Sequence, residues 1–181
     1  MNTIFWFTDD LRLEDNPALV NAAQDDTLTI ISCIDQQAFR TDRFGNLGMG
    51  ALRWQFVQES LIDLQKGLAK HGQTLNLLSG KPSEVVSDLL HTGRFDRVVR
   101  SRQHNSKEMT IWQYLRETFP NILFDEYDSS TLYSLSAVCF TESFPATFSQ
   151  FRRSLDAVTF RTVVHEPEQL PETLEFELES L

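Results

Sequence analysis

Short apolar runs alternate with amphipathic stretches along the first two thirds of the chain. The apolar runs are rich in β-branched and aromatic residues, which is typical of buried strands, and they lie at residues 3–8, 28–35, 74–80, 97–101 and 122–127. The stretches between them have helical spacing of apolar positions and predict helices at residues 16–24, 51–71, 82–92 and 106–119. Strands that alternate with helices predict an α/β fold of the Rossmann-like class: a doubly wound, five-stranded parallel sheet in a three-layer α/β/α arrangement.

Several residues indicate where these helices begin and end. The Asn16 side chain can cap the first helix, and Pro17 suits the first helical position, where no backbone N–H is needed. The long second helix carries an apolar stripe that includes Leu61 and Leu68, and Gly72 is suited to end it.

The pattern changes after residue 127. Residues 145–158 predict one more short amphipathic helix, and from residue 161 onward the chain holds two prolines and many glutamates. We interpret residues 161–181 as an acidic, Pro-containing connector or tail with no partner element. The expected organisation is one α/β domain at residues 1–160, followed by that connector.

The net negative charge of the chain limits the kinds of partner that it can bind. The 181 residues carry a formal net charge of -10, with a sequence pI near 4.8. Because nucleic-acid phosphates require a basic face, we expect no direct nucleic-acid binding. No signal-peptide pattern opens the chain, and no apolar run approaches the ~18 residues that span a bilayer. We therefore expect no membrane contact and a cytoplasmic location.

The motifs of common catalytic and metal sites are missing from the sequence. SGKPS at residues 79–83 lacks the first glycine of a P-loop, and GNLGMG at residues 45–50 has the wrong spacing for a dinucleotide. The four histidines are scattered, and no serine lies in a G-x-S-x-G turn. We interpret Trp6, Trp54 and Trp112 as core residues. No catalytic residue and no metal ligand are assigned, and whether the chain is an enzyme stays open.

The loop at residues 8–16 places many charges directly after the first strand, at the edge of the sheet where open α/β folds bind ligands. Asp10, Arg12 and Asp15 cannot all be buried without partners, because an isolated buried charge is unfavourable. One interpretation is that Arg12 pairs locally with Asp10 or Asp15 and shapes the turn. The other is a charged surface that docks a ligand or another domain, and the residues alone leave both open.

The same loop carries a specific motif. WFTDDLRLEDNPAL, at residues 6–19, resembles the opening W-F-R-x-D-L-R-x-x-D-N-P-A-L of the DNA photolyase/cryptochrome family. The helix at residues 53–68 and the Gly-Lys-Pro turn at residues 80–82 are similar to segments of that family. FPATFSQFRRSLD, at residues 144–156, is similar to a segment of the DASH cryptochrome branch, and residues 163–172 resemble the connector that follows it.

The resemblance implies light-dependent DNA repair or photoreception. Members of the family pair an N-terminal α/β domain, which often holds a folate or deazaflavin antenna pigment, with a helical domain that binds FAD. The helical domain is expected to be absent from this chain, so the chain is expected to bind no FAD and to be inactive alone. The expected partners are an FAD-binding helical domain, in cis or in trans, or a second copy of the chain.

The resemblance also implies which residues contact a pigment. We expect these contacts from Thr8, Asp35, Gln103, Asn105 and Glu108. Thr8 stands where the family usually has Arg, and Gln103 lies near a position where relatives often carry an acidic residue.

Docking to another domain is expected at Asp10, Arg12, Asp15, Phe148 and Arg152. The alternative function is that of a stand-alone, degenerate domain that acts as a protein-interaction or dimerisation module. A nucleotide-binding domain of the wider Rossmann-like class is a third hypothesis, which the missing phosphate motif disfavours.

Overall fold

A computed structural model describes residues 1–133, 144–156 and 158–174. Its elements in chain order are β1 (Asn2–Phe7), α1 (Pro17–Ala22), β2 (Thr27–Asp35), η1 (Gln36–Phe39), α2 (Ala51–Lys70), β3 (Leu75–Gly80), α3 (Pro82–His91), β4 (Arg97–Ser101), α4 (Ser106–Thr118), β5 (Leu123–Tyr127) and α5 (Phe148–Leu155). The strands form one parallel sheet in the order β3-β2-β1-β4-β5. The predicted α/β fold class is confirmed.

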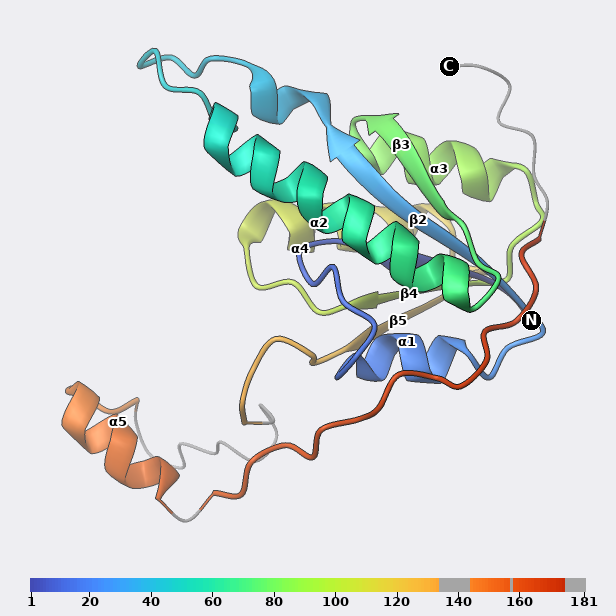
Figure 1. Cartoon of the computed structure of the whole chain (residues 1–181). Coiled ribbons are helices and arrows are strands. Elements are labelled where there is room, and N and C mark those ends of the chain that lie inside the picture. The colour runs from blue at the N-terminus through green and yellow to red at the C-terminus, as the bar shows by residue number, and fades with distance from the viewer. Residues whose placement is uncertain (134–143, 157, 175–181) are drawn as a thin grey trace.

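Helices cover both faces of the sheet (Figure 1). Side chains alternate along β1, so Phe5 and Phe7 pack with α1 and α2 on one face, while Ile4 and Trp6 pack with α3 and α4 on the other. Asn16 caps α1 as predicted, because its side chain accepts a hydrogen bond from Leu19 N at 3.1 Å.

α2 is longer than β1 and β3, two of the strands that it covers. Its 20 residues span about 30 Å, whereas the six residues of β1 span about 20 Å. Its buried side chains, Leu61, Leu64 and Leu68, all lie in the second half of the helix. The first half therefore extends past the carboxyl ends of the strands.

The connector segment, defined here as residues 158–174, lies along the α/β body (Figure 1, red). Val164 O accepts a hydrogen bond from Asp15 N at 2.8 Å, and Glu172 O accepts one from Leu28 N at 3.0 Å. Leu170 packs against the core on the α1 and α2 side, and Leu174 packs against the core on the other side. The prediction that this part of the chain has no partner element is therefore wrong, because its leucines reach both cores and its backbone bonds to the body.

Among the described residues, no helix combines the length and the apolar composition that a membrane span requires.

Candidate functional site

A cavity of about 440 Å³ lies at the carboxyl ends of β1 and β2. Its wall includes the ends of these strands, η1, the first half of α2 and the start of α4; the lining side chains used below are those of Thr8, Asp9, Leu11, Cys33, Asp35, Ala38, Phe39, Arg53, Trp54, Lys107 and Glu108. Its volume is typical of small-molecule sites, and its place is the edge where open α/β sheets bind ligands.

Aromatic side chains form one wall of the cavity. Phe39 of η1 and Trp54 of α2 make an edge-to-face contact, with ring centroids 5.0 Å apart and ring planes at 89°. Phe56 also lines the cavity and is 70% exposed. An exposed aromatic wall of this kind suits a planar ring, because stacking on aromatic faces is favourable.

Charged side chains surround the apolar part of the cavity. Asp35 Oδ1 accepts a hydrogen bond from Gln37 N at 2.9 Å, and Asp35 Oδ2 forms an ion pair with Lys107 Nζ. This pair joins the end of β2 to the start of α4 across the lining. Arg53 adds a second cation.

The Cys33 thiol also lines the cavity. Burial raises the pKa of Cys33 to about 12, so the thiol stays protonated at neutral pH and is not a nucleophile.

Three of the five residues predicted to contact a pigment, Thr8, Asp35 and Glu108, line this cavity. The other two hold neighbouring groups in place. Gln103 Nε2 donates a hydrogen bond to Thr8 Oγ1 at 2.6 Å, and Asn105 Oδ1 accepts one from Glu108 N at 3.0 Å. The pigment-contact roles of all five stay predictions.

Sequence reasoning missed the role of Trp54, which it placed in the core with Trp6 and Trp112. The latter two are buried, but Trp54 is only partly buried and lines the cavity. Trp54 is seven residues before Leu61, on the same side of α2, and the overhang of the helix turns that side into a cavity wall. The signal available in the sequence was the predicted length of this helix compared with that of the strands.

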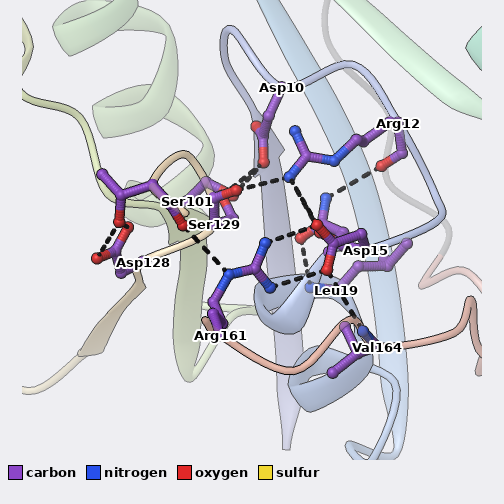
Figure 2. A network of polar contacts seen from close by, with 11 residues as sticks. Asp10, Arg12, Asp15, Leu19, Ser101, Asp128, Ser129, Arg161 and Val164 are labelled. Carbon is purple, nitrogen blue, oxygen red and sulfur yellow. Dashed lines mark hydrogen bonds and ion pairs between the residues drawn. The ribbon is translucent and has the colours of Figure 1, made fainter. Parts of the chain in front are cut away.

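On the other side of the β1–α1 loop, a polar network joins four parts of the chain (Figure 2). Asp10 Oδ2 accepts hydrogen bonds from Ser101 Oγ and, at 3.0 Å, from Ser129 Oγ. In the described part of the chain, Asp10 Oδ1 is buried without a hydrogen-bond partner. Burial raises the pKa of Asp10, against the opposing effect of the two serine hydroxyls.

Arg12 connects the loop to the segment after β5. Its Nη2 donates to Ser129 O at 2.6 Å and to Asp15 O at 3.0 Å, and it lies 3.8 Å from Asp15 Oδ2. The interpretation that Arg12 pairs locally and shapes the turn therefore agrees with the contacts of its guanidinium.

Asp15 is the centre of the network (Figure 2). Its carboxylate accepts hydrogen bonds from Arg161 Nη1 at 2.8 Å and Nη2 at 2.6 Å, and from Val164 N at 3.3 Å. The hydrogen bonds from Arg161 are the largest cause of the lowered pKa of Asp15. Asp15 has φ 52°, a left-handed conformation that costs about 1–2 kcal/mol for a residue with a Cβ and that Asp tolerates better than most. The bonds to Arg161 and Val164 hold it there.

The residues predicted to dock another domain fall into two groups. Asp10, Arg12 and Asp15 bind partners within the chain, as described above. Phe148 and Arg152 lie on α5, which has no buried residue and lies away from the sheet (Figure 1), and Phe148 is 76% exposed. The docking roles of both groups stay predictions.

Comparison with known proteins adds three findings. The family model for DNA photolyase matches residues 3–172. The chain is 32% identical over 170 residues to the cryptochrome DASH of Idiomarina loihiensis. The aligned region covers 93% of this chain and 38% of that protein. It is 33% identical over 162 residues to the chloroplastic/mitochondrial cryptochrome DASH of Arabidopsis thaliana. That aligned region covers 86% of this chain and 28% of that protein.

Comparison with solved structures finds the same fold in a cryptochrome and in a photolyase. The fold matches that of a Synechocystis cryptochrome with a TM-score of 0.91 at 26% identity, covering 98% of this chain and 38% of the other. It also matches the fold of the Sulfolobus tokodaii photolyase, described as holding two FAD molecules, with a TM-score of 0.78 at 21% identity over 97% of this chain and 38% of that one. The chain thus spans less than two fifths of the length of each of these relatives.

Proposed function

Because the chain belongs to the DNA photolyase family, we propose that it is an antenna domain whose cavity binds a planar heteroaromatic pigment, a folate or a deazaflavin. The observation that carries the proposal is the cavity at the carboxyl edge of the sheet, with Phe39 and Trp54 as one wall. A bound pigment would absorb light and pass the excitation to a flavin.

The side chains of the cavity fit such a ligand. Phe39 and Trp54 offer ring surface for stacking, and the cavity volume suits a tricyclic or pterin ring system. Asp35 and Glu108 can accept hydrogen bonds from ring N–H groups, whereas Arg53 and Lys107 suit an anionic tail. The role of this chain is to bind and orient the ring and to exclude water from one of its faces.

We assign light-dependent DNA repair or photoreception to this chain only together with an FAD-binding helical domain, in cis or in trans. In that arrangement the α/β domain supplies excitation energy, and the flavin-bearing domain carries the photochemistry.

Reconstitution tests the pigment site. The purified chain is titrated with methenyltetrahydrofolate, with 8-hydroxy-5-deazaflavin and, for comparison, with FAD, because the fold is shared with a photolyase described as holding two FAD molecules. Induced circular dichroism in the visible band reports a pigment held in one orientation. We expect a signal with the folate or with the deazaflavin, whereas no signal with either of these two would overturn the proposal.

A pair of Trp substitutions locates the site. Ala38→Trp places an indole on the cavity wall and is expected to abolish the induced signal. Asp88→Trp, on the exposed side of α3, adds the same ring away from the cavity and should leave the signal unchanged. Equal effects of the two variants would mean that the pigment binds elsewhere.

A second candidate function is a protein-interaction or dimerisation module. The observation that favours it is α5, where Phe148 is 76% exposed on a helix with no buried residue. Sedimentation at increasing concentration tests self-association, which Phe148→Ser should weaken. A wild-type chain that stays monomeric throughout counts against this candidate.

A further inference from the structure

The β1–α1 loop has two sides with different contacts. Thr8, Asp9 and Leu11 line the cavity, whereas Asp10, Arg12 and Asp15 hold the polar network of Figure 2. The two sets alternate along one short stretch of chain, so movement of one set displaces the other.

We propose that Asp15 and Arg161 form a latch that positions this loop, so that pigment binding in the cavity and attachment of the connector segment are coupled. The inference rests on the proposed pigment site for its ligand. Asp15 and Arg161 touch no bound group themselves and act as positioning residues.

The latch has a defined geometry. Both terminal nitrogens of Arg161 donate to the Asp15 carboxylate. Asp15 N donates to Val164 O, and Val164 N donates to Asp15 Oδ1. The Arg161 side chain is only 18% exposed, so water screens the pair less than it screens a surface ion pair.

The left-handed backbone of Asp15 gives the latch two states. With Arg161 in place, Asp15 stays at φ 52°. Without it, the backbone can relax to an ordinary φ, which would change the path of the chain between Leu11 and Asn16. Since Leu11 lies in the cavity wall, the relaxed state has an altered wall.

The loop also contacts α2, the helix that forms the aromatic wall. Leu13 packs against Gly67 so closely that a Cβ at Gly67 would lie 2.9 Å from Leu13 Cδ1. Arg12 adds a bond to Ser129 O, after β5. The loop is thus held between α2, the connector segment and the segment after β5. The latch is one of its contacts with the connector, beside the hydrogen bond that Glu166 N donates to Glu14 Oε2 at 3.0 Å.

If a pigment binds the latched state in preference to the relaxed one, thermodynamic linkage requires the effect to be mutual. A pigment in the cavity then strengthens attachment of the connector segment, and loss of the latch weakens binding of the pigment. A factor on the order of tenfold in affinity is typical for coupling of this kind.

Hydrogen exchange tests the latch without any pigment. Arg161→Gln is expected to raise amide exchange at residues 8–11, although the hydrogen bonds of Arg161 go to Asp15 and to the backbone oxygens of Thr131 and Leu132. Arg161→Lys should restore part of the protection, because it keeps one charged donor. Arg153→Gln, which removes an exposed arginine of α5, should change nothing at residues 8–11. Faster exchange that is confined to residues 15 and 161–164 would overturn the latch.

Pigment titration of the same variants tests the coupling. We expect Arg161→Gln to weaken binding about tenfold and bound pigment to slow exchange at residues 161–166. Unchanged affinity in Arg161→Gln would overturn the coupling while the pigment site stands. If the wild type binds no pigment, the proposed function fails, and the exchange experiment still decides the latch.

Asp15→Gly is a second variant that does not depend on how Arg161→Gln folds. Glycine adopts a φ of 52° without strain, so this change removes the carboxylate but not the backbone conformation. Asp15→Ala removes the same carboxylate but keeps the strain of a Cβ at this φ, so it should raise exchange at residues 8–11 more than Asp15→Gly does. Equal exchange in the two variants would contradict the latch.

Discussion

Gly80 and Val85 are in contact at the turn between β3 and α3. A Cβ placed on Gly80 would lie 2.9 Å from Val85 Cγ2, and Gly80 has φ 152°, which L side chains rarely adopt. Val85 is 5% exposed and belongs to the core on the α3 and α4 side, so it has little room to move. The Gly-Lys-Pro turn that the family resemblance singled out therefore depends on glycine at its first position.

Gly80→Ala is expected to destabilise the protein by about 2–3 kcal/mol, since it combines backbone strain with overlap in a packed core. Urea unfolding measures the change. Gly50→Ala is the control, because a Cβ there meets nothing within 4 Å and no positive φ is required. Adding Val85→Ala should reduce the penalty of Gly80→Ala, and strictly additive effects would contradict the overlap.

Arg12→Ala is expected to lower the free energy of unfolding by about 1–2 kcal/mol, because it removes charge-assisted bonds to Ser129 O and Asp15 O. The value is modest because the Arg12 side chain is 39% exposed and water can replace part of the contact. Arg12→Lys keeps the positive charge and should lower the free energy of unfolding by less. An unchanged urea midpoint in Arg12→Ala would show that the guanidinium does not brace the loop.

Acid should weaken the contacts of the connector segment. The pKa of Asp15 is lowered chiefly by hydrogen bonds from Arg161, and that of Glu14 chiefly by the backbone N–H of Glu166. Both folded-state values lie below the unfolded ones, which are about 3.9 for Asp and 4.3 for Glu. The stabilisation is therefore complete above about pH 5 and is lost as the pH falls below about 4.

Thermal unfolding between pH 3 and pH 7 checks this dependence. Asp15→Asn lacks the titrating group at residue 15, so its unfolding temperature should fall less steeply in acid than that of the wild type. Parallel curves for the two proteins would show that Asp15 does not contribute.

Asp10 should make the stability of the protein depend on pH in the opposite direction to Asp15 and Glu14. Burial raises its pKa above the unfolded value, so the folded state binds a proton more tightly in the window between the two. Stability therefore falls as the pH rises through that window. Asp10→Asn removes this dependence, and its stability relative to the wild type should increase with pH through the window and then level off. A constant difference in urea unfolding across this range would contradict the assignment.

Much of the fold could be predicted because local patterns determine it. The apolar runs became strands and the amphipathic stretches became helices, with Asn16 and Pro17 starting α1 as expected. The site was predicted in part. The family resemblance implied Thr8, Asp35 and Glu108 among five candidate pigment contacts, and these three line the cavity at the carboxyl ends of the strands.

The rest depends on relationships that no local pattern contains. Trp54 continues the apolar side of α2, so its sequence environment is that of a core residue, and only the overhang of the helix makes it a cavity wall. Leu170 and Leu174 stand among prolines and glutamates, a composition typical of a linker, yet both pack on the cores. Two apolar side chains in a polar run are too few for a periodic signal.

The course of the connector segment has a consequence for synthesis on the ribosome. Leu28 N and Asp15 N find their acceptors in Glu172 and Val164, well over a hundred residues later, and Leu174 reaches a core whose first strand begins at Asn2. A nascent chain that has emerged only as far as β5 has its complete sheet, but these contacts are still missing. These contacts can form only after residue 174 has left the exit tunnel, and expression fragments should extend at least that far.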